Sequence, residues 1–158
     1  MKLLLHACCG PCSLEPVRIL AEAGHDITIA YLNSNIAPAP EYEHRLETLL
    51  EWAKSQDIPV IEGPYEPATW QNAIKQNWDG TQENRADRCR ACYRIRLEEL
   101  ARYAYEHGFE GIGTTLTVSP YQYIDIINEE LERAAAPYEG LSAVFQDFRK
   151  FYPQATIR

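Results

Sequence analysis

Five cysteines fall into two groups whose spacing suits chemistry that uses thiolates. Residues 5–12 read LHACCGPC and hold Cys8, Cys9 and Cys12, and residues 89–92 read CRAC and hold Cys89 and Cys92. Four thiolates suit either a structural zinc ion or an iron–sulfur cluster, and the spacing alone does not distinguish the two. Five clustered thiols are not typical of ordinary core cysteines, so the pattern favours a metal centre.

The tetrapeptide Cys9-Gly-Pro-Cys12 also matches the active site of thioredoxins. A dithiol oxidoreductase that uses Cys9 and Cys12 is therefore an alternative. Against it, Cys8 stands where thioredoxins carry a tryptophan, and the motif comes one strand–helix unit too early. A dithiol shuttle also has no use for a second, distant pair of cysteines.

Composition limits the class of protein. The 158 residues suit one domain with a sizeable core, and no apolar run approaches the length of a membrane helix. The opening MKLLLHAC has too short an apolar stretch for an export signal, so we expect a cytoplasmic protein with reduced thiols and no membrane association. The net charge of −8 argues against broad, non-specific nucleic-acid binding.

Positive charge is concentrated in one segment. Six arginines surround the second cysteine pair, namely Arg85, Arg88, Arg90, Arg94, Arg96 and Arg102. Two readings stay open from charge alone. The arginines form a solvated helix face balanced by Glu98 and Glu99, or they form an anion-binding face beside the cysteines.

Hydrophobic periodicity predicts the elements that must position the cysteines. Strands are expected at 2–7, 26–33, 58–63 and 111–118, and helices at 13–24, 41–56, 66–76, 90–107 and 123–135, with Ser13 capping the first helix. Strands that alternate with helices predict an α/β fold, a three-layer arrangement of a parallel sheet with helices on both faces. We expect residues 1–158 to form a single domain.

The topology predicts where the cysteines meet. Sites in open parallel sheets lie beyond the carboxyl ends of the strands, and the first cysteine group follows the first strand. Gly10 and Pro11 are expected to supply a turn there. Cys89 and Cys92 are expected on one face of a helix start, where the helix dipole favours thiolates. Both groups are therefore predicted to lie at one rim.

Five ordered sequence blocks resemble the QueH family of epoxyqueuosine reductases, the iron–sulfur type that does not use cobalamin. The blocks span nearly the whole chain and are far more specific than a single C-x-x-C motif. They read LLHACCGPCS (4–13), NSNIAPAPEYEHR (33–45), RCRACYRIRLEELA (88–101), TTLTVSPYQ (114–122) and DFRK (147–150).

The resemblance implies a nucleotide-binding, HUP/Rossmann-like fold and an oxidoreductase. Family members reduce the epoxide of epoxyqueuosine to queuosine at the wobble position of tRNA, with a 4Fe–4S cluster and a further iron. By motif, Cys8, Cys9, Cys89 and Cys92 resemble the cluster ligands. Cys12 and Asp147 are then the expected ligands of the further iron. The implied partners are tRNA carrying epoxyqueuosine and an electron donor.

The same resemblance suggests roles for other side chains in a reaction that consumes two electrons and two protons. The candidate proton donors are His6, Tyr121 and Asp147. Cys12 is the thiol expected to hold an iron that keeps open coordination sites for the epoxide. Against these roles, a histidine on a strand is typical of a core, Tyr121 in a Ser-Pro-Tyr turn is typical of packing, and Cys12 would suit a packed turn.

Contacts with tRNA are the last expectation. Arg88, Arg94 and Arg96 are expected to contact phosphates, and Tyr93 or Tyr121 to stack on an extruded base.

The family resemblance is incomplete at the C-terminal end. Family members continue beyond DFRK into a segment with a Cys-Gly-Cys pair, which the 158 residues do not contain. The remaining alternative is a zinc-stabilised, non-catalytic nucleic-acid-binding domain.

Overall fold

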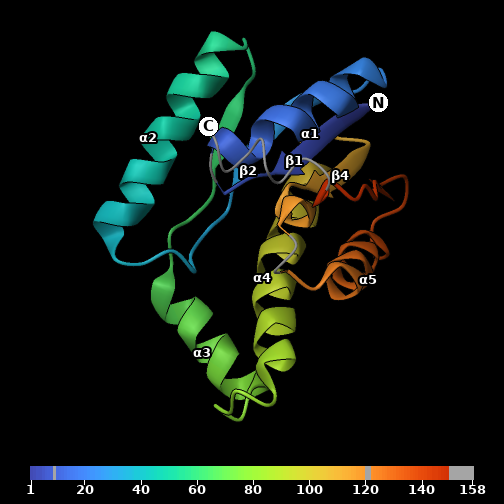
Figure 1. Cartoon of the computed structure of the whole chain (residues 1–158). Helices are drawn as coiled ribbons and strands as arrows, with labels where there is room; N and C mark the ends of the chain where they lie inside the picture. Colours follow the sequence, from blue (N-terminus) through green and yellow to red (C-terminus); the bar gives the residue numbers. More distant parts are fainter. Residues whose placement is uncertain (9, 120–121, 150–158) are drawn as a thin grey trace.

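Parallel strands form the centre of the protein. The computed structural model describes residues 1–8, 10–119 and 122–149. In this part of the chain the sheet has the order β3-β2-β1-β4-β5, and every pair is parallel (Figure 1). The strands are β1 (Lys2–His6), β2 (Asp26–Tyr31), β3 (Val60–Glu62), β4 (Gly111–Thr114) and β5 (Ser142–Ala143). The helices are α1 (Gly10–Glu22), α2 (Ala39–Ser55), α3 (Pro67–Asn77), α4 (Arg85–Glu106) and α5 (Ile124–Ala135).

Alternation along β1 places apolar side chains on both faces of the sheet. Leu3 and Leu5 join the core cluster that contains residues of α1 and α2, whereas Leu4 joins the cluster that contains residues of α4 and α5. All three leucines are fully buried, as expected for a central parallel strand covered by helices on each side. The predicted three-layer α/β fold is confirmed.

Helix α3 lies beside the N-terminal part of α4, away from the sheet (Figure 1). Ile74 of α3 packs with Ala91 and Cys92 of α4, and the rings of Trp70 and Trp78 border this small cluster. Cys92 therefore packs against α3, whereas Cys89 borders the core cluster that contains Leu4 and Tyr93. None of the described helices is both long and apolar enough to cross a membrane.

Three local expectations were wrong. α1 begins at Gly10, so Gly10 and Pro11 open the helix and Ser13 is buried inside it rather than capping it. α4 begins at Arg85, which places Cys89 beyond the first helical turn, where the helix dipole has little effect. The fourth strand ends at Thr114 and is followed by a 3₁₀ turn over Leu116–Val118.

A buried polar network joins the carboxyl ends of the central strands. The Nε2 of His6 bonds Asn33 Oδ1 at 3.0 Å, and its Nδ1 bonds Thr114 Oγ1 at 3.1 Å. Asn33 Nδ2 donates to the Ala7 carbonyl at 2.9 Å, and Arg96 Nη1 donates to Asn33 Oδ1 at 3.3 Å. Because Asn33 Oδ1 can only accept, the imidazole must donate through Nε2 and accept the Thr114 hydroxyl proton through Nδ1.

His6 is held in its neutral form. Burial, assisted by the charge of nearby Arg96, lowers the pKa of His6 to about 3. The side chain is fully buried, as expected for a histidine at the end of a central strand. The neutral imidazole links β1 to β4 and to the segment after β2.

A buried carboxylate fastens α5 to α4. Glu130 is 1% exposed and accepts hydrogen bonds from Arg94 at 2.8 and 3.0 Å and from Arg90 at 3.0 Å. Arg133 lies 3.6 Å away. Burial alone would raise the pKa of Glu130, but the bonds from Arg94 and Arg90 outweigh it and leave the pKa below its ordinary value. Two of the clustered arginines therefore serve the packing of helices.

We expect Glu130→Gln to lower the free energy of unfolding by about 3 kcal/mol, because it leaves partly buried guanidinium groups without their shared carboxylate. Urea unfolding at neutral pH measures the change. Glu129→Gln is the matched control, since Glu129 is exposed and, among the described residues, pairs with Arg90 alone. We expect its change to stay below about 1 kcal/mol. Equal effects of the two substitutions would contradict the role of Glu130.

The network around His6 predicts a loss of stability in acid. The unfolded chain takes up a proton at His6 below pH 6.5, whereas the folded chain resists protonation down to about pH 3. The free energy of unfolding should therefore fall by about 3 kcal/mol from this group between pH 7 and pH 4, at about 1.36 kcal/mol per pKa unit. His6→Gln should remove that part of the pH dependence. His44→Gln, at an exposed position on α2, should retain it, and parallel profiles for all three proteins would contradict the prediction.

Candidate functional site

The two cysteine groups come from elements that meet at the carboxyl edge of the sheet. Cys8 follows β1, and Cys89 lies on α4; both are half-buried and pack against the core cluster that includes Tyr93. Cys9 lies outside the described residues, as does the side chain of Cys12, whose backbone is part of α1. The expectation that the two groups gather on one rim therefore stays a prediction.

The Cys89 thiol is held mainly in its neutral form by its surroundings. Burial raises the pKa of the Cys89 thiol, and neighbouring Cys92 raises it further, while Arg88 and Arg85 partly offset both effects. A cation bound at the thiolate of Cys89 would reverse this effect and favour its charged form. We predicted that the helix dipole would favour the thiolate of Cys89, but in the structure burial favours the neutral thiol instead.

Cys92 has a hydrogen-bond donor aimed at its sulfur. Trp70 Nε1 of α3 donates to Cys92 Sγ at 3.3 Å, and the cysteine is 7% exposed. Hydrogen bonds to thiolate sulfur are among the means by which proteins tune thiolate-held metal centres. The donor set therefore fits a soft, thiolate-bound metal group. Among residues 1–8, 10–119 and 122–149, however, no group of three or more His, Cys, Asp or Glu side chains stands ready to hold a metal ion.

Asp147 is engaged elsewhere in this structure. Its carboxylate accepts hydrogen bonds from Arg149 at 2.6 and 3.0 Å, and these bonds hold the pKa of Asp147 below its ordinary value. The segment is joined to the region after β4, because Phe148 N donates to the Thr117 carbonyl. To bind iron, Asp147 would have to leave Arg149, so its role as a ligand stays a prediction.

The predicted aromatic and acid–base residues divide into three cases. Tyr121 lies outside the described residues. Tyr93 is 2% exposed, donates its hydroxyl proton to Gln122, and has a pKa raised by burial, so its ring is not presented for stacking on a base. The fully buried and neutral His6 has both ring nitrogens engaged, an arrangement that suits positioning better than proton donation.

The arginines predicted to contact phosphate also differ in their surroundings. Arg94 is committed to Glu130. The guanidinium of Arg88 lies 5.5 Å from the ring centre of Trp70 and 5.8 Å from that of Trp78, and it forms no ion pair with any described carboxylate. Arg96 is buried beside Asn33. Among the described residues, Arg88 and Arg96 therefore form no ion pair with a carboxylate, and the same holds for Arg85, which bonds the Tyr123 hydroxyl.

Sequence reasoning missed Asn33 and Trp70. Asn33 follows the second predicted strand, and the rule that sites gather beyond strand ends would have marked it. Trp70 gave no such signal, because its contact with Cys92 depends on how α3 packs against α4.

Comparison with known proteins identifies the family of this chain. A family model described as epoxyqueuosine reductase QueH matches residues 3–157. Three curated relatives carry the name epoxyqueuosine reductase QueH. The Haemophilus influenzae protein is 35% identical over 94% of this chain and 60% of its own length. The Acinetobacter baylyi protein is 35% identical over 94% of the chain and 67% of its own length. The Dehalococcoides mccartyi protein is 32% identical over 96% of the chain and 79% of its own length.

The chain thus spans well under the full length of several of its relatives, including 60% of the Haemophilus influenzae protein. The match nevertheless covers both cysteine groups, the carboxyl edge of the sheet and almost all of the described structure. By its sequence over residues 3–157, this chain belongs to the epoxyqueuosine reductase QueH family.

Proposed function

We propose that this protein reduces the epoxide of epoxyqueuosine in tRNA, in the cytoplasm, and releases queuosine-containing tRNA. Removal of the epoxide oxygen as water consumes two electrons and two protons and leaves a carbon–carbon double bond. The observation that carries the proposal is the family match across both cysteine groups, whose elements meet at the carboxyl edge of the sheet. The electrons come from an external donor of low potential.

Cys8, Cys9, Cys89 and Cys92 are the proposed ligands of a 4Fe–4S cluster, and Cys12 with Asp147 those of a further iron. Such a centre supplies electrons one at a time, and a Lewis-acidic iron can polarise a carbon–oxygen bond. The spacing of Cys89 and Cys92 on α4 and the indole N–H aimed at Cys92 support a thiolate-bound group at this place.

The protein's own residues orient the reacting parts. The polar network of His6, Asn33 and Thr114 holds the end of β1, from which Cys8 follows, in a defined position. The half-buried Trp70 covers Cys92 and limits its access to water. Tyr121 is the proposed source of protons, since His6 is neutral and enclosed and the pKa of Asp147 is held below its ordinary value by Arg149.

Anaerobic purification followed by a turnover assay tests the function. We expect a brown protein that contains iron and sulfide and converts epoxyqueuosine to queuosine in tRNA when a chemical reductant is supplied, as measured by nucleoside mass spectrometry. A colourless protein with one equivalent of zinc and no conversion would instead favour the zinc-stabilised, non-catalytic alternative. A protein free of metal, with a reversible disulfide between Cys9 and Cys12, would favour the dithiol alternative.

Cys89→Ser and Cys92→Ser should each lower the iron and sulfide content severalfold, because a serine oxygen is a poor replacement for a thiolate at iron. Metal and sulfide analysis of anaerobically purified protein measures the loss. Ala91→Ser adds the same hydroxyl between the two positions without removing a thiol, and it should keep the parent's content. Full iron and sulfide in Cys89→Ser would remove that residue from the proposed ligands.

Arg88→Gln should weaken tRNA binding and reduce the slope of log K against log salt concentration by about 0.7 to 0.9, the change for one lost phosphate contact. Fluorescence anisotropy with labelled tRNA over a range of salt concentrations measures the slope. Arg102→Gln is a control on the same helix, since Arg102 pairs with Glu99 and Glu106. An unchanged slope in Arg88→Gln would contradict a phosphate contact and leave Arg88 with only its structural contact to the two tryptophans.

A further inference from the structure

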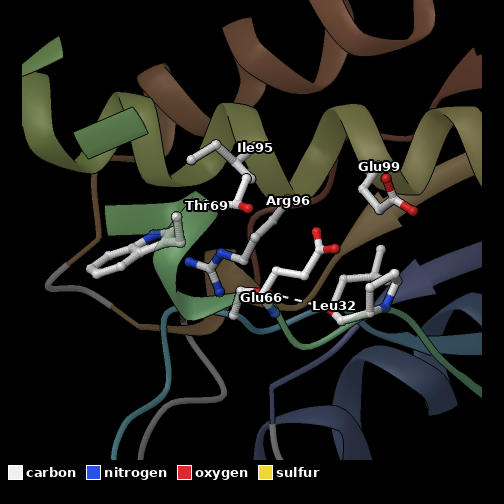
Figure 2. A pocket seen from close by; sticks show the side chains of 9 residues that line it. Leu32, Glu66, Thr69, Ile95, Arg96 and Glu99 are labelled. Atoms are coloured by element: carbon white, nitrogen blue, oxygen red, sulfur yellow. Dashed lines mark hydrogen bonds between the residues drawn. The ribbon is translucent and has the colours of Figure 1, made fainter. Parts of the chain in front are cut away.

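A small cavity opens beside the second cysteine group. Its walls come from the segments after β2 and β3 and from α3 and α4, and its volume is about 160 Å³ (Figure 2). Trp70, which donates to Cys92 Sγ, is part of the wall, so the cavity adjoins the proposed metal ligands. Sites that enclose a whole small molecule usually measure about 300–1,000 Å³. The cavity is therefore sized for one group of a larger ligand.

Arg96, in the wall of this cavity, has fewer hydrogen-bond partners than its guanidinium has donors. Its side chain extends from α4 toward the segment that follows β2 (Figure 2). The residue is 7% exposed, yet its only hydrogen bond among the described residues is the 3.3 Å contact from Nη1 to Asn33. Within the described part of the chain its buried Nε has no hydrogen-bond partner, and none of the described carboxylates forms an ion pair with Arg96. A guanidinium has five donors, and a buried one left this incomplete favours an anionic acceptor.

A carboxylate also lines this cavity but forms no ion pair with Arg96. Glu66 is exposed at the wall, and no ion pair joins it to any described cation. Its backbone N–H donates to Ser34 Oγ at 3.0 Å, which anchors the residue at the start of α3. The second acidic residue of the wall, Glu99, is paired with Arg102. The cavity therefore offers a buried donor on one side and a free acceptor on another.

One unit of RNA backbone presents the complementary pair of groups. Its phosphate oxygens accept hydrogen bonds from a guanidinium, and its 2′-hydroxyl can donate to a carboxylate. A free anion would use Arg96 but would give the Glu66 carboxylate no hydrogen-bond donor. Resting on the proposed function, we propose that the cavity holds one ribose–phosphate unit of the tRNA, with Arg96 on the phosphate and Glu66 on the 2′-hydroxyl. Glu66 then lets the protein distinguish RNA from DNA next to its metal ligands.

The test compares two hairpins with the same anticodon-loop sequence, one of ribonucleotides throughout and one with 2′-deoxynucleotides in the loop. Fluorescence anisotropy with the anaerobically purified, metal-loaded protein measures both affinities. We expect three- to tenfold tighter binding of the all-ribose hairpin. Glu66→Ala should bring the two affinities together by weakening only the ribose form. Glu51→Ala, which removes an exposed carboxylate from α2, should keep the preference.

Arg96→Gln supplies the second arm. It should weaken the binding of both hairpins and reduce the salt slope by about 0.7, the value for one phosphate contact of a single strand. Arg18→Gln, at an exposed position on α1, should leave the slope unchanged. Circular dichroism reports whether Arg96→Gln is folded, and if it is not, Glu66→Ala decides the matter alone.

Equal affinity of the parent protein for the two hairpins, or a ribose preference retained in Glu66→Ala, would overturn the inference. Competition by inorganic phosphate with no ribose preference would also overturn it and leave a plain anion site. If either result accompanies normal epoxyqueuosine reduction, the inference fails alone. If the protein binds neither hairpin and does not act on tRNA, the proposed function fails with it.

Discussion

The satisfaction of buried polar groups at the carboxyl edge of the sheet is the constraint on which the candidate site depends. Asn33 uses its amide to bond the chain after β1, and its carbonyl oxygen receives His6 and Arg96. An unpaired polar group at this depth would cost about 1–3 kcal/mol, so these partners require one another. The ends of β1 and β4, the segment after β2 and helix α4 are thereby held together at the place where the cysteines gather.

The same requirement explains how an arginine-rich helix fits an acidic protein. Glu130, buried between α4 and α5, neutralises Arg90 and Arg94, so those residues act in packing. Arg88 is covered by Trp70 and Trp78, and Arg96 keeps most of its donors unused. Positive charge is therefore local and directed to the rim, although the chain as a whole carries a net charge of −8.

Trp70 connects the two functions proposed for this rim. Its indole N–H contacts Cys92, its ring contacts Arg88, and its side chain forms part of the wall of the cavity beside Arg96. A change in the position of α3 would thus alter the surroundings of the proposed metal ligand and of the proposed RNA contacts together. This arrangement would couple the binding of the substrate backbone to the environment of the thiolate.

Local pattern was enough to predict the layers and the edge of the sheet that carries the site. Alternating apolar strands and amphipathic helices leave few stable arrangements, and the cysteine motif at the end of the first strand could lie only at the carboxyl edge. The family resemblance, now confirmed over residues 3–157, also rested on ordered motifs in the sequence alone. Strand order, however, had to come from the structure, because it depends on contacts between segments far apart in the chain.

Only the tertiary structure decided what individual side chains do. Because α4 begins at Arg85, Cys89 lies beyond the first helical turn, and burial rather than the helix dipole governs its pKa. The difference between Arg94 and Arg96, two residues apart on one helix, depends on whether Glu130 or Asn33 lies opposite. Sequence determines which chemical groups are present and on which element. Their charge state and availability depend on neighbours that the fold brings from elsewhere in the chain.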